Sequence, residues 1–169
     1  MRRVASLVMA VALIAAGCGS SSTSPSNAPV VFTATLLPSN ETSAIQGGET
    51  TGSGTVTITM NTTKDASGTI TSATTSFNVT LTGFPATTNI ILAHIHEGAS
   101  GVAGPIRVNT GIANGDVPLT NGAGGFQKLN VNTDAALAQQ IINNPAGFYF
   151  NVHSTANGAG VARGQLVKQ

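Results

Sequence analysis

Charge is scarce in this chain of 169 residues, and two other features are absent or rare. Charged residues make up 8% of the sequence, tryptophan is absent, and there is a single cysteine. One cysteine cannot form an intrachain disulfide, so no disulfide framework supports the fold. When Arg2 and Arg3 are set aside with the leader described below, five basic residues face six acidic ones. A chain without a basic surplus is not expected to bind nucleic acid.

The rest of the composition is typical of one β-rich domain. Hydrophobic residues make up 41% of the chain, and there are 20 glycines alongside abundant threonine, asparagine and alanine. This length is enough for a single domain with a sizeable core, and no second block of different composition is present. Threonine-rich segments favour strands over a helical bundle. We therefore expect one domain over 30–169.

The first 18 residues have the organisation of an export signal. Arg2 and Arg3 precede an apolar run over 4–16, too short for a comfortable membrane span, and Gly17 and Cys18 follow. The segment resembles a bacterial lipoprotein signal, in which small residues direct cleavage before a cysteine that then carries lipid. The resemblance implies a signal peptide over 1–17 and a lipid-anchored Cys18. A plain secretory signal with an incidental cysteine is the alternative.

Residues 18–29 are rich in serine and proline and contain little to bury. Such composition favours a flexible tether between the lipid and the domain. The expected location is the cell envelope, facing the periplasm or the outside.

Alternation of apolar and polar residues predicts a series of strands. Val56, Ile58 and Met60 alternate with threonines over 55–60, which is the period-two pattern of a half-buried strand. Comparable patterns, separated by turn residues, occur at 30–37, 75–81, 90–96, 105–110, 125–131, 148–153 and 160–167. The strand at 90–96 is largely apolar on both faces, so we expect it in the middle of a sheet.

One helix is predicted over 134–143, where apolar residues form a stripe. Asn132 or Thr133 is expected to cap its start, and Pro145 follows its end. Short antiparallel strands with one helix in a connection predict an all-β, two-sheet sandwich with Greek-key-like wiring.

Two of the three histidines stand two residues apart on the predicted central strand. In an extended strand, side chains at i and i+2 point to the same face roughly 6.5 to 7 Å apart. His94 and His96 are therefore able to hold one ion or ligand between them. His153 ends another predicted strand, on the same face as Tyr149 and Asn151.

Three sequence blocks in a fixed order carry a family resemblance. The first is Ala93-His94-Ile95-His96-Glu97-Gly98 with Gly101 and Gly104-Pro105-Ile106, the second is Gly147-Phe148-Tyr149-Phe150-Asn151-Val152-His153, and the third is Arg163-Gly164-Gln165-Leu166. These blocks resemble those of the CHRD domain, a family named from chordin and found also in exported bacterial proteins. The resemblance covers most of 32–166 and implies an immunoglobulin-like or related β-sandwich outside the cytoplasm. It implies structural roles for the motif residues Glu97, Gly98, Gly104, Pro105, Asn151, Arg163 and Gln165.

A weaker resemblance is to Cu/Zn superoxide dismutase, another β-sandwich. The shared features are a His-x-His-Glu strand, a glycine-rich loop, a later Val-His and a glycine-rich last strand. That enzyme needs further histidines and an aspartate for its two metals, and also a structural disulfide. This chain has three histidines and one cysteine. The usual dismutase site is therefore not expected.

The histidines leave three interpretations open. If His94, His96 and His153 converge, three neutral imidazoles bind copper or zinc and leave a fourth position for water or a ligand. Alternatively, the rings are hydrogen-bonded members of a polar layer with a structural role. A small-ligand or pH-sensing site is the third interpretation, because histidine titrates near neutral pH.

Arg163 and Gln165 point to the same face of the last predicted strand. We expect Arg163 to be half-buried and paired with an acid such as Glu97, and Gln165 to bond backbone groups. Glycines at 98, 101 and 104 permit tight turns before Pro105.

The leading interpretation is a lipid-anchored CHRD domain that acts as a binding or structural module and is not an enzyme. Its expected contacts are the membrane, through Cys18, and an extracellular or periplasmic protein or small ligand. The competing interpretation is a copper- or zinc-binding module, or a dismutase-like redox enzyme, that uses the three histidines.

Overall fold

The computed structural model describes residues 26–169. The predicted signal peptide and Cys18 lie outside the described residues. Within them, the strands are β1 (Val30–Leu36), β2 (Ser53–Lys64), β3 (Ile70–Thr82), β4 (Ile90–Glu97), β5 (Ile106–Asn109), β6 (Leu119–Thr120), β7 (Ala123–Thr133), β8 (Phe148–Ser154), β9 (Ala162–Gln165) and β10 (Val167–Lys168). The helices are α1 (Ala135–Asn143) and the short 3-10 turns η1 (Pro38–Asn40), η2 (Glu49–Thr51) and η3 (Pro145–Gly147).

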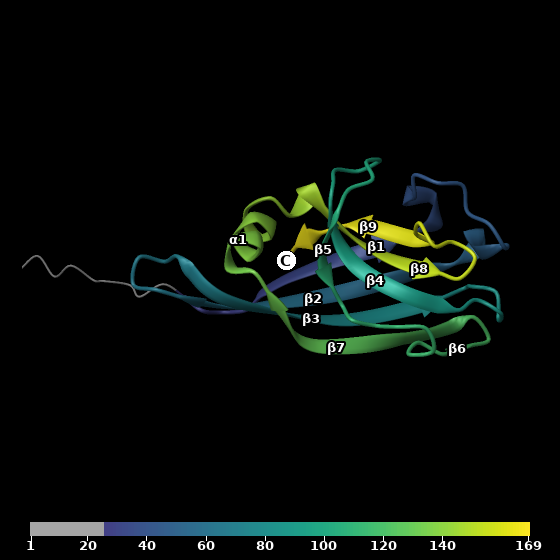
Figure 1. The fold of residues 1–169 in the computed structure, drawn as a ribbon, viewed down its shortest axis with the longest axis horizontal. Coiled ribbons are helices and arrows are strands. Elements are labelled where there is room, and N and C mark those ends of the chain that lie inside the picture. The colour runs from purple at the N-terminus through teal and green to yellow at the C-terminus, as the bar shows by residue number, and fades with distance from the viewer. Residues whose placement is uncertain (1–25) are drawn as a thin grey trace, which may run out of the picture.

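The strands form two antiparallel sheets. One sheet has the order β10-β1-β2-β3-β7-β6, and the other has the order β5-β4-β8-β9. Figure 1 shows them as two layers, with β4, β8 and β9 in one and β2, β3 and β7 in the other. The predicted all-β, two-sheet sandwich is confirmed, and so is the interior position of the strand that carries His94 and His96.

The core lies between the two sheets and follows from the period-two patterns. On β2, Val56, Ile58 and Met60 are at most 1% exposed, while the alternate threonines face outward. The rings of Phe77 from β3 and Phe150 from β8 meet across the layers with centroids 5.6 Å apart. Burial of this apolar surface is the main contribution that favours folding.

The helix begins one residue later than the sequence analysis expected. Asp134 is the N-cap, and its carboxylate accepts a hydrogen bond from the backbone N–H of Leu137 at 2.9 Å. The predicted caps, Asn132 and Thr133, are wrong because both residues still belong to β7. The helix follows β7 and precedes β8 in the chain, and in Figure 1 it lies towards one end of the sandwich. No helix within 26–169 is long and apolar enough to cross a membrane.

The predicted last strand, 160–167, is two strands in the structure. β9 pairs with β8, whereas β10 pairs with β1 in the other sheet, and Leu166 is buried between them. An isolated bridge between Leu37 and Arg163 also joins the layers at this point. The chain end therefore ties the two sheets together beside the third family block.

Candidate metal centre

The three histidines share one face of the four-stranded sheet, the face turned away from the core. His94 of β4 is opposite Asn151 of β8, and His96 is opposite Tyr149. His153 lies two residues beyond Asn151 and points to the same side. The three histidines are 2%, 8% and 5% exposed, respectively. The register of β4 and β8 therefore brings His153 to the pair that the sequence singled out.

The three rings converge on a small volume. One ring nitrogen of each histidine can be chosen so that all three lie within 4.8 Å of one another. Nδ1 of His94 is 3.2 Å from Nε2 of His153. Neighbouring nitrogens around a tetrahedral zinc ion are roughly 3.3 Å apart when the bonds are about 2.0 Å long. Nδ1 of His94 and Nε2 of His153 thus already have the spacing of two ligands of one ion.

Backbone carbonyls fix the orientation of two of the rings. Nδ1 of His96 lies 2.9 Å from the carbonyl of Gly104, and Nδ1 of His153 lies 3.0 Å from the carbonyl of Gly158. Only a protonated Nδ1 can donate to a carbonyl, so each Nε2 keeps its lone pair. Metal-binding histidines are usually held this way. Within 26–169, the buried Nε2 of His96 has no hydrogen-bond partner.

The rings are electrically neutral at neutral pH. Burial lowers the pKa of His94 to about 4, and the neighbouring rings of His153 and His96 contribute to the lowering. Burial also lowers the pKa of His96 and that of His153, and the hydrogen bonds to Gly104 and Gly158 only partly oppose this. Neutral imidazole is the form that binds a metal, so the site needs little proton release to accept one.

Tyr149 contacts both His96 and a buried positive charge. The rings of His96 and Tyr149 stack with centroids 4.9 Å apart and an interplanar angle of 7°. The guanidinium carbon of Arg163 lies 4.5 Å from the centre of the Tyr149 ring, a cation–π contact. Arg163 is 2% exposed.

The expected pairing of Arg163 with Glu97 is wrong. Glu97 is half exposed and pairs with Arg107 at 2.6 Å. Because side chains alternate along β4, Glu97 points to the face opposite His96 and therefore away from Arg163. The carboxylate beside Arg163 is Glu41, whose Oε2 lies 4.0 Å from the Arg163 Nε. The Arg163 guanidinium donates instead to the carbonyls of Asn40 and Val102, at 2.6 and 3.0 Å.

The other motif residues hold the loop between β4 and β5 over the site. Gln165 donates to the carbonyls of Gly98, Ala146 and Phe148, which confirms its expected role as a backbone partner. Gly104 packs so tightly that a Cβ would lie 1.6 Å from the carbonyl oxygen of Glu97. The Pro105 carbonyl accepts from the Glu97 N–H at 3.0 Å. The glycines of this block therefore let the loop close onto the strand that carries the histidines.

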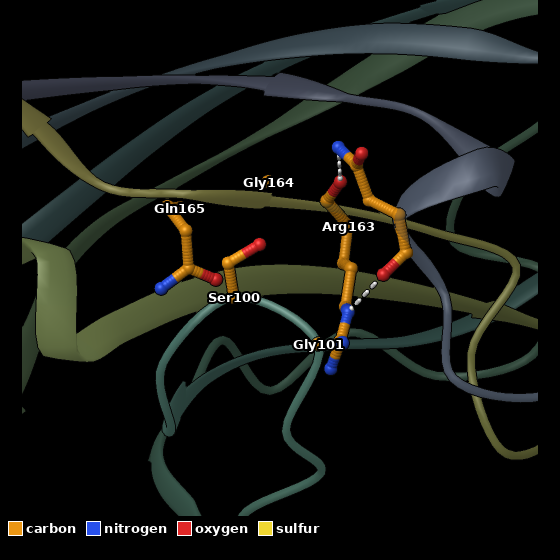
Figure 2. A pocket seen from close by; sticks show the side chains of 6 residues that line it. Ser100, Gly101, Arg163, Gly164 and Gln165 are labelled. Atoms are coloured by element: carbon orange, nitrogen blue, oxygen red, sulfur yellow. Dashed lines mark hydrogen bonds between the residues drawn. The ribbon is translucent and has the colours of Figure 1, made fainter.

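A small polar pocket borders the same layer at β9. Its volume is about 180 Å³, and its lining residues are Asn40, Ser100, Gly101, Arg163, Gly164 and Gln165. Figure 2 shows the side chain of Arg163 along one wall, hydrogen-bonded to Asn40, with Ser100 and Gln165 on the opposite side. The pocket does not include a histidine.

Sequence reasoning missed Glu41 as a site residue and left Tyr149 without a role. Glu41 follows the turn η1, where no strand periodicity predicts the direction of its side chain. Side chains alternate along 148–153, so Tyr149 lies on the same face as Asn151 and His153. This pattern could have predicted that Tyr149 contacts the histidines. Burial raises the pKa of Glu41 to about 7, although the charge of Arg163 partly opposes the rise.

These observations define an antiparallel β-sandwich with a buried histidine cluster on the outer face of its smaller sheet. The family model of the CHRD domain matches residues 32–166, and the chain belongs to this family. Membership supports a binding or structural module. Comparison with curated proteins and with solved structures found no match. The resemblance to Cu/Zn superoxide dismutase therefore stays a prediction.

Proposed function

We propose that this CHRD domain is an extracytoplasmic metal-binding module that takes one copper or zinc ion at His94, His96 and His153. The observation that carries the proposal is the convergence of three neutral imidazoles, with ligand nitrogens within 4.8 Å of one another. Among the histidine, cysteine, aspartate and glutamate side chains of the described residues, these three histidines form the group whose ligand atoms are spaced to bind a metal. Neutral imidazole is a ligand that suits both copper and zinc.

The arrangement of protons supports a metal role over a purely structural one. Without an ion, Nδ1 of His94 faces the lone pair of His153 Nε2 across 3.2 Å. Two facing lone pairs would repel each other, so His94 Nδ1 must carry a proton and donate it to His153 Nε2. That bond satisfies His153 but leaves the His96 Nε2 buried without a partner among residues 26–169. A buried polar atom left unpaired costs about 1 to 3 kcal/mol. If the His94 proton moves from Nδ1 to Nε2 of the same ring, Nδ1 of His94 and Nε2 of His96 and His153 all present lone pairs, and one ion would be bound by these three nitrogens.

The module is proposed to bind its ion without catalysis of its own. Three histidines leave a fourth position open, which is the arrangement that a redox or hydrolytic metal site also uses. The alternative, a dismutase-like redox enzyme, predicts superoxide consumption by the metal-loaded protein. If the metal-loaded protein consumes superoxide no faster than the His94→Ala variant does, the result supports a binding module without catalysis.

The proposed place of action is the outer side of a bacterial membrane. Lipid on Cys18 would hold the domain there, through the tether at 18–29, and an unidentified periplasmic or extracellular protein or small ligand would be its partner. The apolar run before Gly17-Cys18 supports this location.

The test is elemental analysis of the purified full chain in detergent, after exposure to copper or zinc and removal of excess ion. The wild type should retain about one ion per chain, and His94→Ala and His153→Ala should retain little. Glu97→Gln is the matched control, because Glu97 follows His96 on β4 but points to the other face and pairs with Arg107. It should retain the ion. A wild type that stays free of metal, with no shift in thermal stability, would overturn the proposal.

A further inference from the structure

Arg163 is a fixed positive charge in the same buried layer as the three histidines. Arg163 is on β9 and pairs with Asn151 of β8, and Asn151 in turn pairs with His94 of β4. Two backbone carbonyls, those of Asn40 and Val102, hold its guanidinium in place. Because arginine stays protonated at every physiological pH, this charge is always present.

The charge of Arg163 is incompletely balanced. The nearest carboxylate, Glu41, is 4.0 Å away, and no hydrogen bond joins the two groups. Within the described part of the chain, Oε1 of Glu41 and Nη2 of Arg163 are both buried without a hydrogen-bond partner. Burial raises the pKa of Glu41 to about 7, so near neutral pH the carboxyl is only partly ionised.

The field of Arg163 reaches the histidines. The centre of the Tyr149 ring is 4.5 Å from the guanidinium carbon of Arg163 and 4.9 Å from the centre of the His96 ring, so the guanidinium carbon and the His96 ring centre are at most 9.4 Å apart. A cation bound at the His96 ring is therefore close enough to be repelled by the charge of Arg163, and the repulsion is proportional to the charge of the cation.

The three ligands carry no negative charge, so they do not offset the positive charge of a bound ion. All three are neutral imidazoles, and the cluster of side chains with metal-binding spacing includes no carboxylate or thiolate among the described residues. A divalent ion therefore brings two uncompensated charges into the layer beside Arg163, and a monovalent ion brings one. The cost of burying charge rises steeply with its magnitude.

We propose that this centre discriminates against divalent ions and is a copper(I) site, with Arg163 as the residue that sets the preference and Glu41 as its partial counter-charge. The inference rests on the proposed metal-binding function. Imidazole binds copper well, and copper(I) is the copper ion that adds the smallest charge to this layer.

The experiment compares the affinities of the full chain for copper(I) and zinc(II) at pH 8 in detergent. Copper(I) is measured anaerobically by competition with a chromogenic chelator, and zinc(II) by competition with a fluorescent indicator. Arg163→Gln should raise the zinc(II) affinity about tenfold more than the copper(I) affinity, the size expected for a unit charge at this distance. Arg163→Lys, which keeps the charge, should leave the ratio of the two affinities near that of the wild type.

Glu41→Gln provides an independent test if Arg163→Gln does not fold. It removes the negative charge at pH 8 while keeping the shape of the side chain. Zinc(II) affinity should therefore fall more than copper(I) affinity, opposite in sign to the effect of Arg163→Gln. A wild type that binds neither ion contradicts the proposed function itself. A wild type that binds both, with a ratio that neither charge change alters, contradicts only the inference about copper(I).

Discussion

Nδ1 of His94 lies 3.2 Å from Nε2 of His153, although the two residues are 59 positions apart in the sequence. The register of β4 against β8 creates this proximity, and the carbonyl of Gly158 orients the His153 ring by accepting from its other nitrogen. The strand register brings the imidazoles together, and backbone carbonyls in the loops orient the rings so that one ion can bind them.

Gly104→Ala should damage both the fold and the centre. A Cβ at this position would meet the Glu97 carbonyl at 1.6 Å, so the loop has to move and takes with it the carbonyl that orients His96. We expect a loss of about 2 kcal/mol in the free energy of unfolding and weaker metal retention, measured by urea unfolding and elemental analysis.

Gly158→Ala is the matched control for this change. The Gly158 carbonyl orients His153, but a Cβ on Gly158 has no atom within 4 Å in the described structure. The variant should be close to the wild type in both stability and metal retention. Equal losses in the two alanine variants would contradict the steric explanation.

Stability in the presence of a chelator should fall as the pH falls below 6.5. The pKa of each of the three histidines is below 6.5 in the folded chain, so below pH 6.5 the unfolded chain binds more protons than the folded chain; for His94 this difference extends down to about pH 4. Their contribution is therefore complete above pH 6.5 and is lost through this window. Thermal unfolding across pH 4 to 8 measures it. His94→Asn removes one of the three groups and should reduce the loss, and an unchanged profile in that variant would contradict the assignment.

Glu41→Gln should stabilise the metal-free protein at pH 8 and not at pH 5. Burial raises the pKa of Glu41 from 4.5 to about 7, so the contribution of Glu41 to stability is complete below 4.5 and is lost as the pH rises through 7. Glutamine has a similar shape and never ionises. We expect a gain on the order of 2 kcal/mol at pH 8, measured by urea unfolding at both pH values. An equal effect at pH 5 would show that packing, and not charge, is responsible.

Cys18→Ser should release the protein from membranes and abolish labelling with a radioactive or clickable fatty acid. The reason is that serine offers no thiol to receive lipid. Fractionation of cells that express the two forms checks the expectation. Membrane association that survives the substitution would point to a different anchor.

Much of the scaffold was predictable from local patterns, because a half-buried strand shows its two faces directly in the sequence. Val56, Ile58 and Met60 are an example, and the shared face of His94 and His96 is another. The split of the last strand at Leu166 was not predictable, since β9 and β10 continue one alternating pattern and differ only in which sheet they join.

The site was predictable only in part. The convergence of His153 depends on strand register, which one sequence does not reveal. The partner of Arg163 illustrates two different errors. Glu97 could have been excluded as the partner of Arg163, because it is adjacent to His96 on β4 and therefore points to the opposite face of the sheet. Glu41 was not identifiable, because its side chain is directed by the turn η1 and by contacts with residues more than a hundred positions away.

X-ray absorption of the protein loaded with one copper ion tests the central claim most directly. The account predicts a first shell that contains three imidazole nitrogens at about 2.0 Å, with the outer-shell scattering that imidazole rings produce, and the loss of one ring in His96→Ala. A first shell of oxygen ligands without imidazole scattering, or a spectrum that does not change in His96→Ala, would contradict it.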